Sequence, residues 1–241
     1  MRRCWLIVPA AGSGTRVGGE RPKQYLSLNG SPVLACTLER LYRAFPEACL
    51  CLSLKHDDSW FDPNLVPFRD WRRIDGGDER VDSVLNALRA IESEAAPEDL
   101  VLVHDVARPC VAVDDLCKLE QTALENEAGA LLATPVADTI KRDDDHGLVA
   151  RTQDRRGLWQ AQTPQGFRYG LLRQALEAAL GPCGIGRDRV TDESSAVEAL
   201  GLFPRLVQGR RDNIKITHPE DLPMAELILQ AQRKAAATQD E

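Results

Sequence analysis

The chain has 241 residues, of which 43% are hydrophobic and 28% charged, and its formal net charge is −7. This length suits one α/β domain, so we expect residues 1–241 to form a single unit. The acidic balance argues against a general nucleic-acid binder, because affinity for a phosphate backbone requires a surplus of Lys and Arg.

The first half of the chain alternates apolar runs with helical patterns. Apolar runs lie at 4–8, 48–54 and 100–104. They lack the alternation of apolar and polar residues typical of a half-exposed strand, so they predict strands that are buried on both faces. Helical patterns lie at 32–44, 81–93 and 114–126. This β-α-β-α order predicts an α/β fold with a mainly parallel sheet and helices on both of its faces.

The second half begins with a segment of a different kind. Within 132–163, a charged turn at 141–147 separates two stretches that carry β-favouring residues. We expect a β-hairpin arm over about 135–162, and sequence alone leaves open whether it serves a dimer or lies in solvent. Helical patterns return at 169–180, at 191–200 and after Pro219, which suits a first helical position.

The first apolar run leads into Pro9-Ala-Ala-Gly-Ser-Gly-Thr-Arg16. Glycines and small residues let backbone N–H groups approach an anion closely, so the segment predicts a phosphate-binding loop, with a structural strand-to-helix turn as the alternative. A dinucleotide fingerprint would need a third glycine at position 17, where this chain has Val17. A Walker A motif fails too, because no Gly-Lys-Ser/Thr follows the loop.

Cations follow this loop closely, at Arg16, Arg21 and Lys23. Arg holds phosphate oxygens in a fork, whereas Lys acts as a point charge. Each alone would be an ordinary surface charge, but their place on the loop favours a role in binding phosphate.

The run at 100–104 ends in His104-Asp-Val-Ala-Arg-Pro109. Asp105 and Arg108 thus lie just past the carboxyl end of a strand, where open α/β sheets bind ligands. Asp105 can hold Mg²⁺ against phosphate oxygens, and its alternative role is that of a turn residue. His104 is expected to be a satisfied strand-end histidine rather than a ligand.

Seven motifs in order along nearly the whole chain resemble those of the 2-C-methyl-D-erythritol 4-phosphate cytidylyltransferases. They are Pro9-Ala-Ala-Gly-Ser-Gly-Thr-Arg16, Pro22-Lys-Gln-Tyr25, Asp75-Gly-Gly-Asp-Glu-Arg-Val-Asp-Ser-Val84, His104-Asp-Val-Ala-Arg-Pro109, Thr163-Pro-Gln165, Val190-Thr-Asp-Glu193 and Asp212-Asn-Ile-Lys-Ile-Thr217. The resemblance implies a Rossmann-like three-layer α/β/α sandwich with a protruding β-arm that completes the partner's site in a homodimer. It also implies transfer of the cytidylyl group of CTP to methylerythritol phosphate, by in-line attack on the α-phosphate with release of pyrophosphate, in the non-mevalonate route to isoprenoids.

The resemblance also assigns roles to residues. It makes Arg16, Lys23 and Lys215 catalytic, as the cations that stabilise the transition state and the leaving pyrophosphate. Asp105 would bind Mg²⁺, another divalent cation or the ribose. The expected CTP-binding residues are Pro9, Ala10, Ala11, Gly12, Ser13, Gly14, Gly77, Asp78, Ser83 and Asp105. Within this set, Gly77, Asp78 and Ser83 would read cytosine, although Asp78 could be a turn residue and Ser83 a helix cap.

The acceptor pocket is implied in the same way, with Thr139 and Arg155 supplied by the partner's arm. The expected acceptor-binding residues are Arg108, Thr139, Arg155, Thr163, Thr191 and Lys215. Thr191 could instead cap a helix, and Thr139 and Arg155 could be ordinary hairpin surface. One departure is Val106, which replaces an expected Ala and adds bulk near the proposed ribose.

Three alternatives remain beside this interpretation. A cytidylyltransferase for another polyol phosphate, such as ribitol 5-phosphate, would share the nucleotide half of the site. A noncatalytic nucleotide-binding protein of this fold is disfavoured by the presence of Arg16, Lys23, Asp105 and Lys215. A nicotinamide dehydrogenase would bind its cofactor without releasing pyrophosphate.

The cysteines and the apolar runs indicate where the protein works. The seven cysteines form no Cys-x-x-Cys pair, and an odd number cannot close into a full set of disulfides, so we expect a reducing compartment. The apolar run 4–11 is too short for a signal peptide, and no stretch approaches the roughly 20 apolar residues of a membrane span. These features predict a cytoplasmic protein with no membrane partner.

Overall fold

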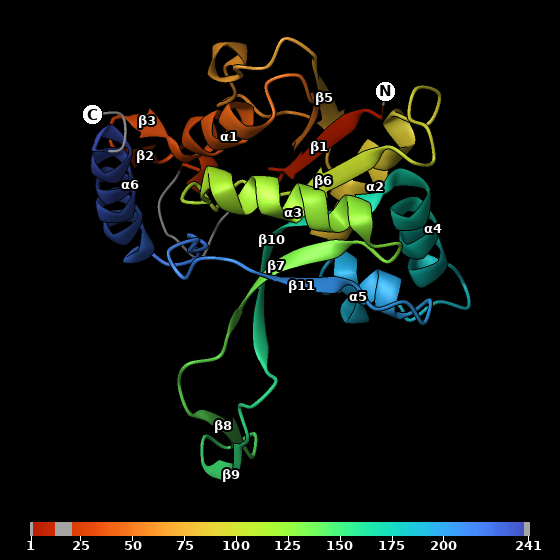
Figure 1. Ribbon diagram of the computed structural model, residues 1–241, viewed down its shortest axis with the longest axis vertical. Coiled ribbons are helices and arrows are strands. Elements are labelled where there is room, and N and C mark those ends of the chain that lie inside the picture. Colours follow the sequence, from red (N-terminus) through yellow and green to blue (C-terminus); the bar gives the residue numbers. More distant parts are fainter. Residues whose placement is uncertain (1, 13–20, 239–241) are drawn as a thin grey trace.

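The computed structural model describes residues 2–12 and 21–238, and its centre is a seven-stranded sheet (Figure 1). Across the sheet the strands are β11 (Arg205–Gln208), β7 (Ala130–Pro135), β10 (Trp159–Arg168), β6 (Leu100–Val103), β1 (Cys4–Pro9), β4 (Cys49–Leu54) and β5 (Trp71–Asp75). A short pair, β2 (Ser27–Leu28) and β3 (Ser31–Pro32), lies apart from it.

Most neighbours in the sheet run parallel. Strands β6, β1, β4 and β5 lie in this order across the sheet, and each is parallel to its neighbour. Strand β11 is parallel to β7. Strand β10 is the exception, because it runs antiparallel to both β6 and β7. The predicted mainly parallel sheet is confirmed, and the antiparallel β10 is a feature that the β-α-β-α rhythm did not indicate.

Successive side chains of β1 point to opposite faces of the sheet, and both faces are covered by helices. Leu6 and Val8 lie in one buried cluster, while Trp5 and Ile7 lie in the other. The first cluster contains residues of α1 (Val33–Ala44) and α3 (Val113–Glu125), and the second contains residues of α2 (Arg80–Ala90), α4 (Tyr169–Leu180) and α5 (Glu193–Glu198). The predicted three-layer α/β/α sandwich is therefore confirmed.

The last helix, α6 (Asp221–Ala237), lies at one side of the molecule (Figure 1). Its Ala225 and Leu229 are buried in a third cluster together with Ala107 and Ile216. Pro219 does not open this helix, contrary to our expectation, but lies in the turn before it. The helix begins at Asp221, whose carboxylate fixes the preceding turn by accepting hydrogen bonds from Thr217 N and His218 N at 2.7 and 2.8 Å.

The short pair β2 and β3 was not predicted, and neither were the two edge strands of the seven-stranded sheet. Strands β5 and β11 are short and carry charged residues among their apolar ones, which is how edge strands avoid further pairing. Their apolar content is too low to distinguish them from loops. Helix α5 is shorter than predicted, because Asp192 caps its first turn by accepting a hydrogen bond from Ser195 N at 2.9 Å.

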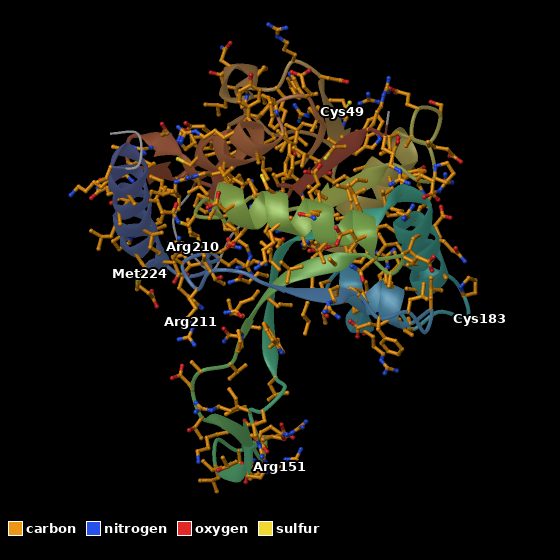
Figure 2. All side chains as sticks on the ribbon, in the orientation of Figure 1. Cys49, Arg151, Cys183, Arg210, Arg211 and Met224 are labelled. Atoms are coloured by element: carbon orange, nitrogen blue, oxygen red, sulfur yellow. The ribbon has the colours of Figure 1, made fainter. Side chains whose placement is uncertain are left out.

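A hairpin of β8 (Ile140–Asp143) and β9 (Val149–Gln153) projects away from the sheet (Figure 1). It lies within the range 135–162 expected for the arm. The chain leaves the sheet after β7 and returns along its antiparallel neighbour β10, so the arm is an insertion between two paired strands. Figure 2 shows Arg151 at the far end of this arm. Among the residues described, none of the helices has the length and apolar character needed to cross a membrane.

Candidate active site

A pocket of about 650 Å³ opens beyond the carboxyl ends of β1 and β6. Because parallel strands end at the same edge of a sheet, the segments that follow them converge there. Many of the residues singled out in the sequence line this pocket. They are Pro9, Ala10, Ala11, Gly12, Lys23, Gly77, Asp78, Ser83, Asp105 and Lys215. Three further predicted residues, Ser13, Gly14 and Arg16, lie outside the described residues.

The start of the predicted phosphate loop is fixed by hydrogen bonds to its backbone. Ala10 N donates to Ser53 O at 2.7 Å, and the buried side chain of Gln24 donates to Ala10 O at 2.8 Å. Lys23 precedes Gln24 in a 3₁₀ turn, and its Nζ donates to Ile216 O at 3.4 Å. The loop cation Lys23 and the segment carrying Lys215 are therefore neighbours, although they are far apart in the sequence.

Asp105 is the electrostatic centre of the pocket. Arg80 Nε lies 2.8 Å from its Oδ1, and Lys215 Nζ lies 2.8 Å from its Oδ2. Arg108 Nε lies 3.6 Å from the same Oδ2. Burial opposes ionisation of this carboxyl group, but Arg80, Lys215 and Arg108 outweigh burial and hold the pKa of Asp105 well below its usual range. Asp105 is therefore an anion at any pH near neutrality.

A chain of buried hydrogen bonds that includes the backbone N–H of Asp105 fixes the segment after β6. His104 Nε2 lies 3.1 Å from Arg108 O, which can only accept, so this ring nitrogen carries the proton. His104 Nδ1 then accepts from the hydroxyl of Thr163 at 3.1 Å, and that hydroxyl accepts from Asp105 N at 3.0 Å. Burial lowers the pKa of His104 to about 4, so the ring is neutral. The expectation of a satisfied strand-end histidine is confirmed.

The turn between β5 and α2 lines the pocket with Gly77, Asp78 and Glu79. Gly77 N donates to Ser83 Oγ at 3.1 Å, and that hydroxyl in turn donates to Glu79 O at 3.3 Å. A Cβ on Gly77 would lie 2.2 Å from Asp82 Cβ, and one on Gly76 would lie 2.3 Å from Ala11 Cβ. The turn needs both glycines because it packs directly on the helix and on the phosphate loop.

Sequence reasoning missed Arg80 and Glu193, which belong to the same charge network. Arg80 donates to Asp105 and, through both terminal nitrogens, to Glu193 at 2.6 and 3.0 Å. One signal was available in the sequence. A cation in the first turn of a helix opposes the helix dipole, so Arg80 at the start of α2 indicates a partner elsewhere.

The remaining predicted acceptor residues do not line the pocket. Arg108 and Thr163 lie directly behind Asp105, where Arg108 Nη1 also donates to Asn213 O at 2.8 Å. Thr191 is exposed just before α5. Thr139 and Arg155 are exposed on the arm, where Asp154 pairs with Arg156 at 2.5 Å. Val106 is buried and lines the pocket beside Asp105.

Comparisons with known proteins agree along nearly the whole chain. A profile of the family described as 2-C-methyl-D-erythritol 4-phosphate cytidylyltransferase matches residues 4–231. The chain is 58% identical over 229 residues to the protein of that name from Chromohalobacter salexigens, covering 95% of this chain and 90% of that protein. It is 50% identical over 229 residues to that from Hahella chejuensis, covering 94% and 93%.

Solved structures of the same kind of protein share the fold. A crystal structure of a 4-diphosphocytidyl-2C-methyl-D-erythritol synthase superposes with a TM-score of 0.81 at 37% identity, covering 95% of this chain and 99% of that one. The 2-C-methyl-D-erythritol 4-phosphate cytidylyltransferase of Francisella tularensis superposes with a TM-score of 0.79 at 32% identity, covering 94% and 99%.

Proposed function

The chain belongs to the 2-C-methyl-D-erythritol 4-phosphate cytidylyltransferase family, and we propose how its residues divide the work of that reaction. The activity is transfer of the cytidylyl group of CTP to 2-C-methyl-D-erythritol 4-phosphate, in the route to isoprenoids. The products are 4-diphosphocytidyl-2-C-methyl-D-erythritol and pyrophosphate. One observation carries the assignment of residues. Lys23, Lys215 and Asp105, from three distant segments, line a single pocket.

The reaction requires charge stabilisation rather than proton abstraction. The acceptor phosphate is already an anion at neutral pH, so its oxygen attacks the α-phosphorus of CTP without a general base. A bond forms between that oxygen and the α-phosphorus, while the bond from the α-phosphorus to the β-phosphate oxygen breaks and pyrophosphate leaves. The barrier lies in bringing two polyanions together and stabilising the charge on the crowded phosphorus.

The cations of the pocket fit this requirement. We assign Lys215 to the α-phosphate and Lys23, with Arg16, to the leaving pyrophosphate. In support, both lysines line the pocket, and Lys23 contacts Ile216 O next to Lys215. The backbone of Ala10, Ala11 and Gly12 would receive the phosphates, because a segment without bulky side chains lets oxygens approach N–H groups closely.

A divalent cation such as Mg²⁺ fits the residues present. Magnesium at nucleotide sites is commonly held by one or two carboxylates together with substrate phosphates. Asp105 lines the pocket and is ionised, and its Oδ2 would hold the ion together with phosphate oxygens of CTP once Lys215 turns from it to a phosphate. When bound, the ion supplies neutralisation of phosphate charge.

Cytosine recognition is assigned to the turn at Gly77 and Asp78. Ser83 supports this turn through its hydrogen bond to Gly77 N, so its hydroxyl contributes by holding the turn as well as by facing the base. A turn held in this way presents backbone donors and acceptors at fixed positions. Such a site rejects bases that leave its buried polar groups unpaired.

The acceptor side is assigned to two subunits. Arg108, Thr163, Thr191 and Lys215 would contribute from one chain, and Thr139 and Arg155 would come from the arm of a second copy. The arm supports this proposal because it projects from the sheet (Figure 1). Both residues are exposed on it.

We also propose a reducing compartment, the cytoplasm, since all seven cysteines are free thiols.

The test is turnover with defined substrates. Purified protein with CTP, Mg²⁺ and methylerythritol phosphate should release pyrophosphate, measured with a coupled pyrophosphatase assay. Ribitol 5-phosphate should be a far poorer acceptor under the same conditions. Faster consumption of ribitol 5-phosphate would reassign the acceptor pocket, and wild-type turnover in both Arg16→Ala and Lys23→Ala would overturn the catalytic roles.

A further inference from the structure

Arg80 joins three segments that are distant in the sequence. It is the first residue of α2 and directly follows the turn that lines the pocket at Gly77, Asp78 and Glu79. Its guanidinium contacts Asp105 after β6 and Glu193 at the start of α5. From this geometry we propose that Arg80 and Glu193 form a positioning pair, which fixes the orientation of Asp105 in the pocket.

The contacts of Arg80 divide its guanidinium between two anions. Nη1 and Nη2 donate to the two carboxylate oxygens of Glu193 at 2.6 and 3.0 Å, while Nε donates to Asp105 Oδ1 at 2.8 Å. A planar fork with five N–H donors can hold both carboxylates at once, which a lysine ammonium cannot do in the same geometry. Because Oδ1 is held, Oδ2 is the oxygen that faces Lys215.

Glu193 keeps Arg80 in this orientation. Its side chain is only 1% exposed, so its charge requires a partner, and the structure gives it the bidentate contact with Arg80. Without that contact Arg80 would be free to turn its whole fork onto Asp105 and compete with Lys215 for the carboxylate. Glu193 thus acts on the pocket through Arg80.

The backbone that carries Glu193 is itself fixed to the sheet. Gln165 on β10 donates to Asp192 Oδ2 at 2.8 Å and accepts from Ser194 N at 2.8 Å. The residues on both sides of Glu193 are therefore tied to the same amide side chain. A rigid support of this kind is what a positioning residue needs, because small displacements of catalytic groups are costly.

The inference rests on the proposed function, and substitutions that separate stability from positioning test it. In Arg80→Met, buried Glu193 loses its counter-charge, so both the thermal midpoint and kcat should fall. In the double variant Arg80→Met with Glu193→Met, no unpaired charge remains at position 193, and the midpoint should recover most of its loss, because Asp105 keeps Lys215 and Arg108. Its kcat should nevertheless stay about tenfold or more below wild type, and its Kd for CTP, measured by calorimetry without acceptor, should be raised about fivefold or more.

Conservative variants give a second measurement. Glu193→Gln keeps the size of the side chain and should still lower kcat about fivefold or more, and Arg80→Lys should fail to restore wild-type kcat because it lacks the fork. The matched control is Arg173→Met on α4, since Arg173 also bridges two carboxylates, Glu92 at 2.7 Å and Glu177 at 3.2 Å, but lies outside the pocket. It should keep wild-type kcat and Kd for CTP.

Two outcomes would overturn the positioning pair. One is a double variant that folds and regains wild-type kcat and Kd, since the pair would then serve stability alone. The other is a Glu193→Gln protein with unchanged kcat and Kd, which decides the question if the double variant fails to fold. Pyrophosphate release by wild-type protein in the same assay tests the proposed function separately, so failure of the pair leaves that function intact.

Discussion

Lys215 Nζ lies 2.8 Å from Asp105 Oδ2, so a cation and an anion that both line the pocket are paired with each other. A phosphate oxygen that contacts Lys215 must compete with this carboxylate. Because Asp105 also contacts Arg80 and Arg108, it loses only part of its counter-charge when Lys215 turns to a phosphate. The ion pair thus holds Lys215 in the pocket, and Asp105 stays paired with two other cations when Lys215 moves.

Replacement of Lys215 should therefore affect turnover far more than stability. Lys215→Met is expected to lower kcat by about 100-fold, the size of effect seen when one preorganised donor to a transition state is removed. The thermal midpoint should change little, because the side chain is 41% exposed and Asp105 keeps its other cations. Lys118→Met, an exposed lysine of α3 outside the pocket, is the control. A kcat within twofold of wild type would remove Lys215 from the catalytic residues.

Substitution by alanine should affect CTP binding at Gly12 and stability at Gly76. Within the described part of the chain, a Cβ on Gly12 would meet no atom within 4 Å, whereas one on Gly76 would lie 2.3 Å from Ala11 Cβ. Gly12→Ala should keep the thermal midpoint and raise the KM for CTP, because the methyl group occupies space proposed for phosphate. Gly76→Ala should lower the midpoint. An unchanged KM in Gly12→Ala would argue against phosphate binding at this residue.

The buried His104 should make stability depend on pH in a defined direction. Its pKa is about 4 in the folded protein and near 6.5 when exposed, so between these values the unfolded chain binds a proton that the folded protein does not. Stability therefore falls as pH is lowered from 6.5 to 4, by up to about 3 kcal/mol from this residue.

Denaturant unfolding of His104→Gln against wild type measures this contribution, with EDTA present to exclude metal binding. The variant should lose that part of the pH dependence while retaining the part due to carboxylates. His146→Gln, an exposed position on the arm, should keep the wild-type profile. Parallel profiles for wild type and His104→Gln would contradict the neutral buried ring.

Partner completion of the site predicts complementation between two impaired variants, assayed at an acceptor concentration too low for Arg155→Ala to turn over. If Arg155 acts on the other subunit's pocket, a mixed dimer of Arg155→Ala and Lys215→Met has one site with both defects and one with neither. Random mixing in equal amounts should then restore about one quarter of wild-type activity. Arg155→Ala alone should raise the KM for the acceptor more than that for CTP. A mixture no more active than its components would count against the shared site.

The sequence predicted those parts of the site that follow from local order along the chain. Lys23 follows a glycine-rich loop after the first strand, and Asp105 follows the third apolar run, so the rule that strand ends converge was enough to bring them together. Helix α4 was predicted at its observed bounds because its apolar residues recur at helical spacing. The catalytic role of Arg16 stays a prediction, because that residue lies outside the described part of the chain.

Contacts between distant segments could not be predicted in this way. Arg80 and Glu193 are 113 positions apart, and they meet only because α2 and α5 cover the same face of the sheet, where residues of both helices lie in one buried cluster. The hydroxyl of Thr163 similarly contacts Asp105 N across 58 positions. Edge strands β5 and β11 were missed for a different reason, since partial exposure dilutes the apolar signal that identifies buried strands.

The position of the arm has a consequence for engineering. It is inserted between β7 and β10, which are hydrogen-bonded to each other inside the sheet. We therefore expect that a hairpin of another length or sequence can replace it while the remaining strands keep their pairing. The pocket around Asp105 is lined by other segments of the chain. If the arm contacts the acceptor, acceptor preference can be redesigned as a separate module while CTP binding is left in place.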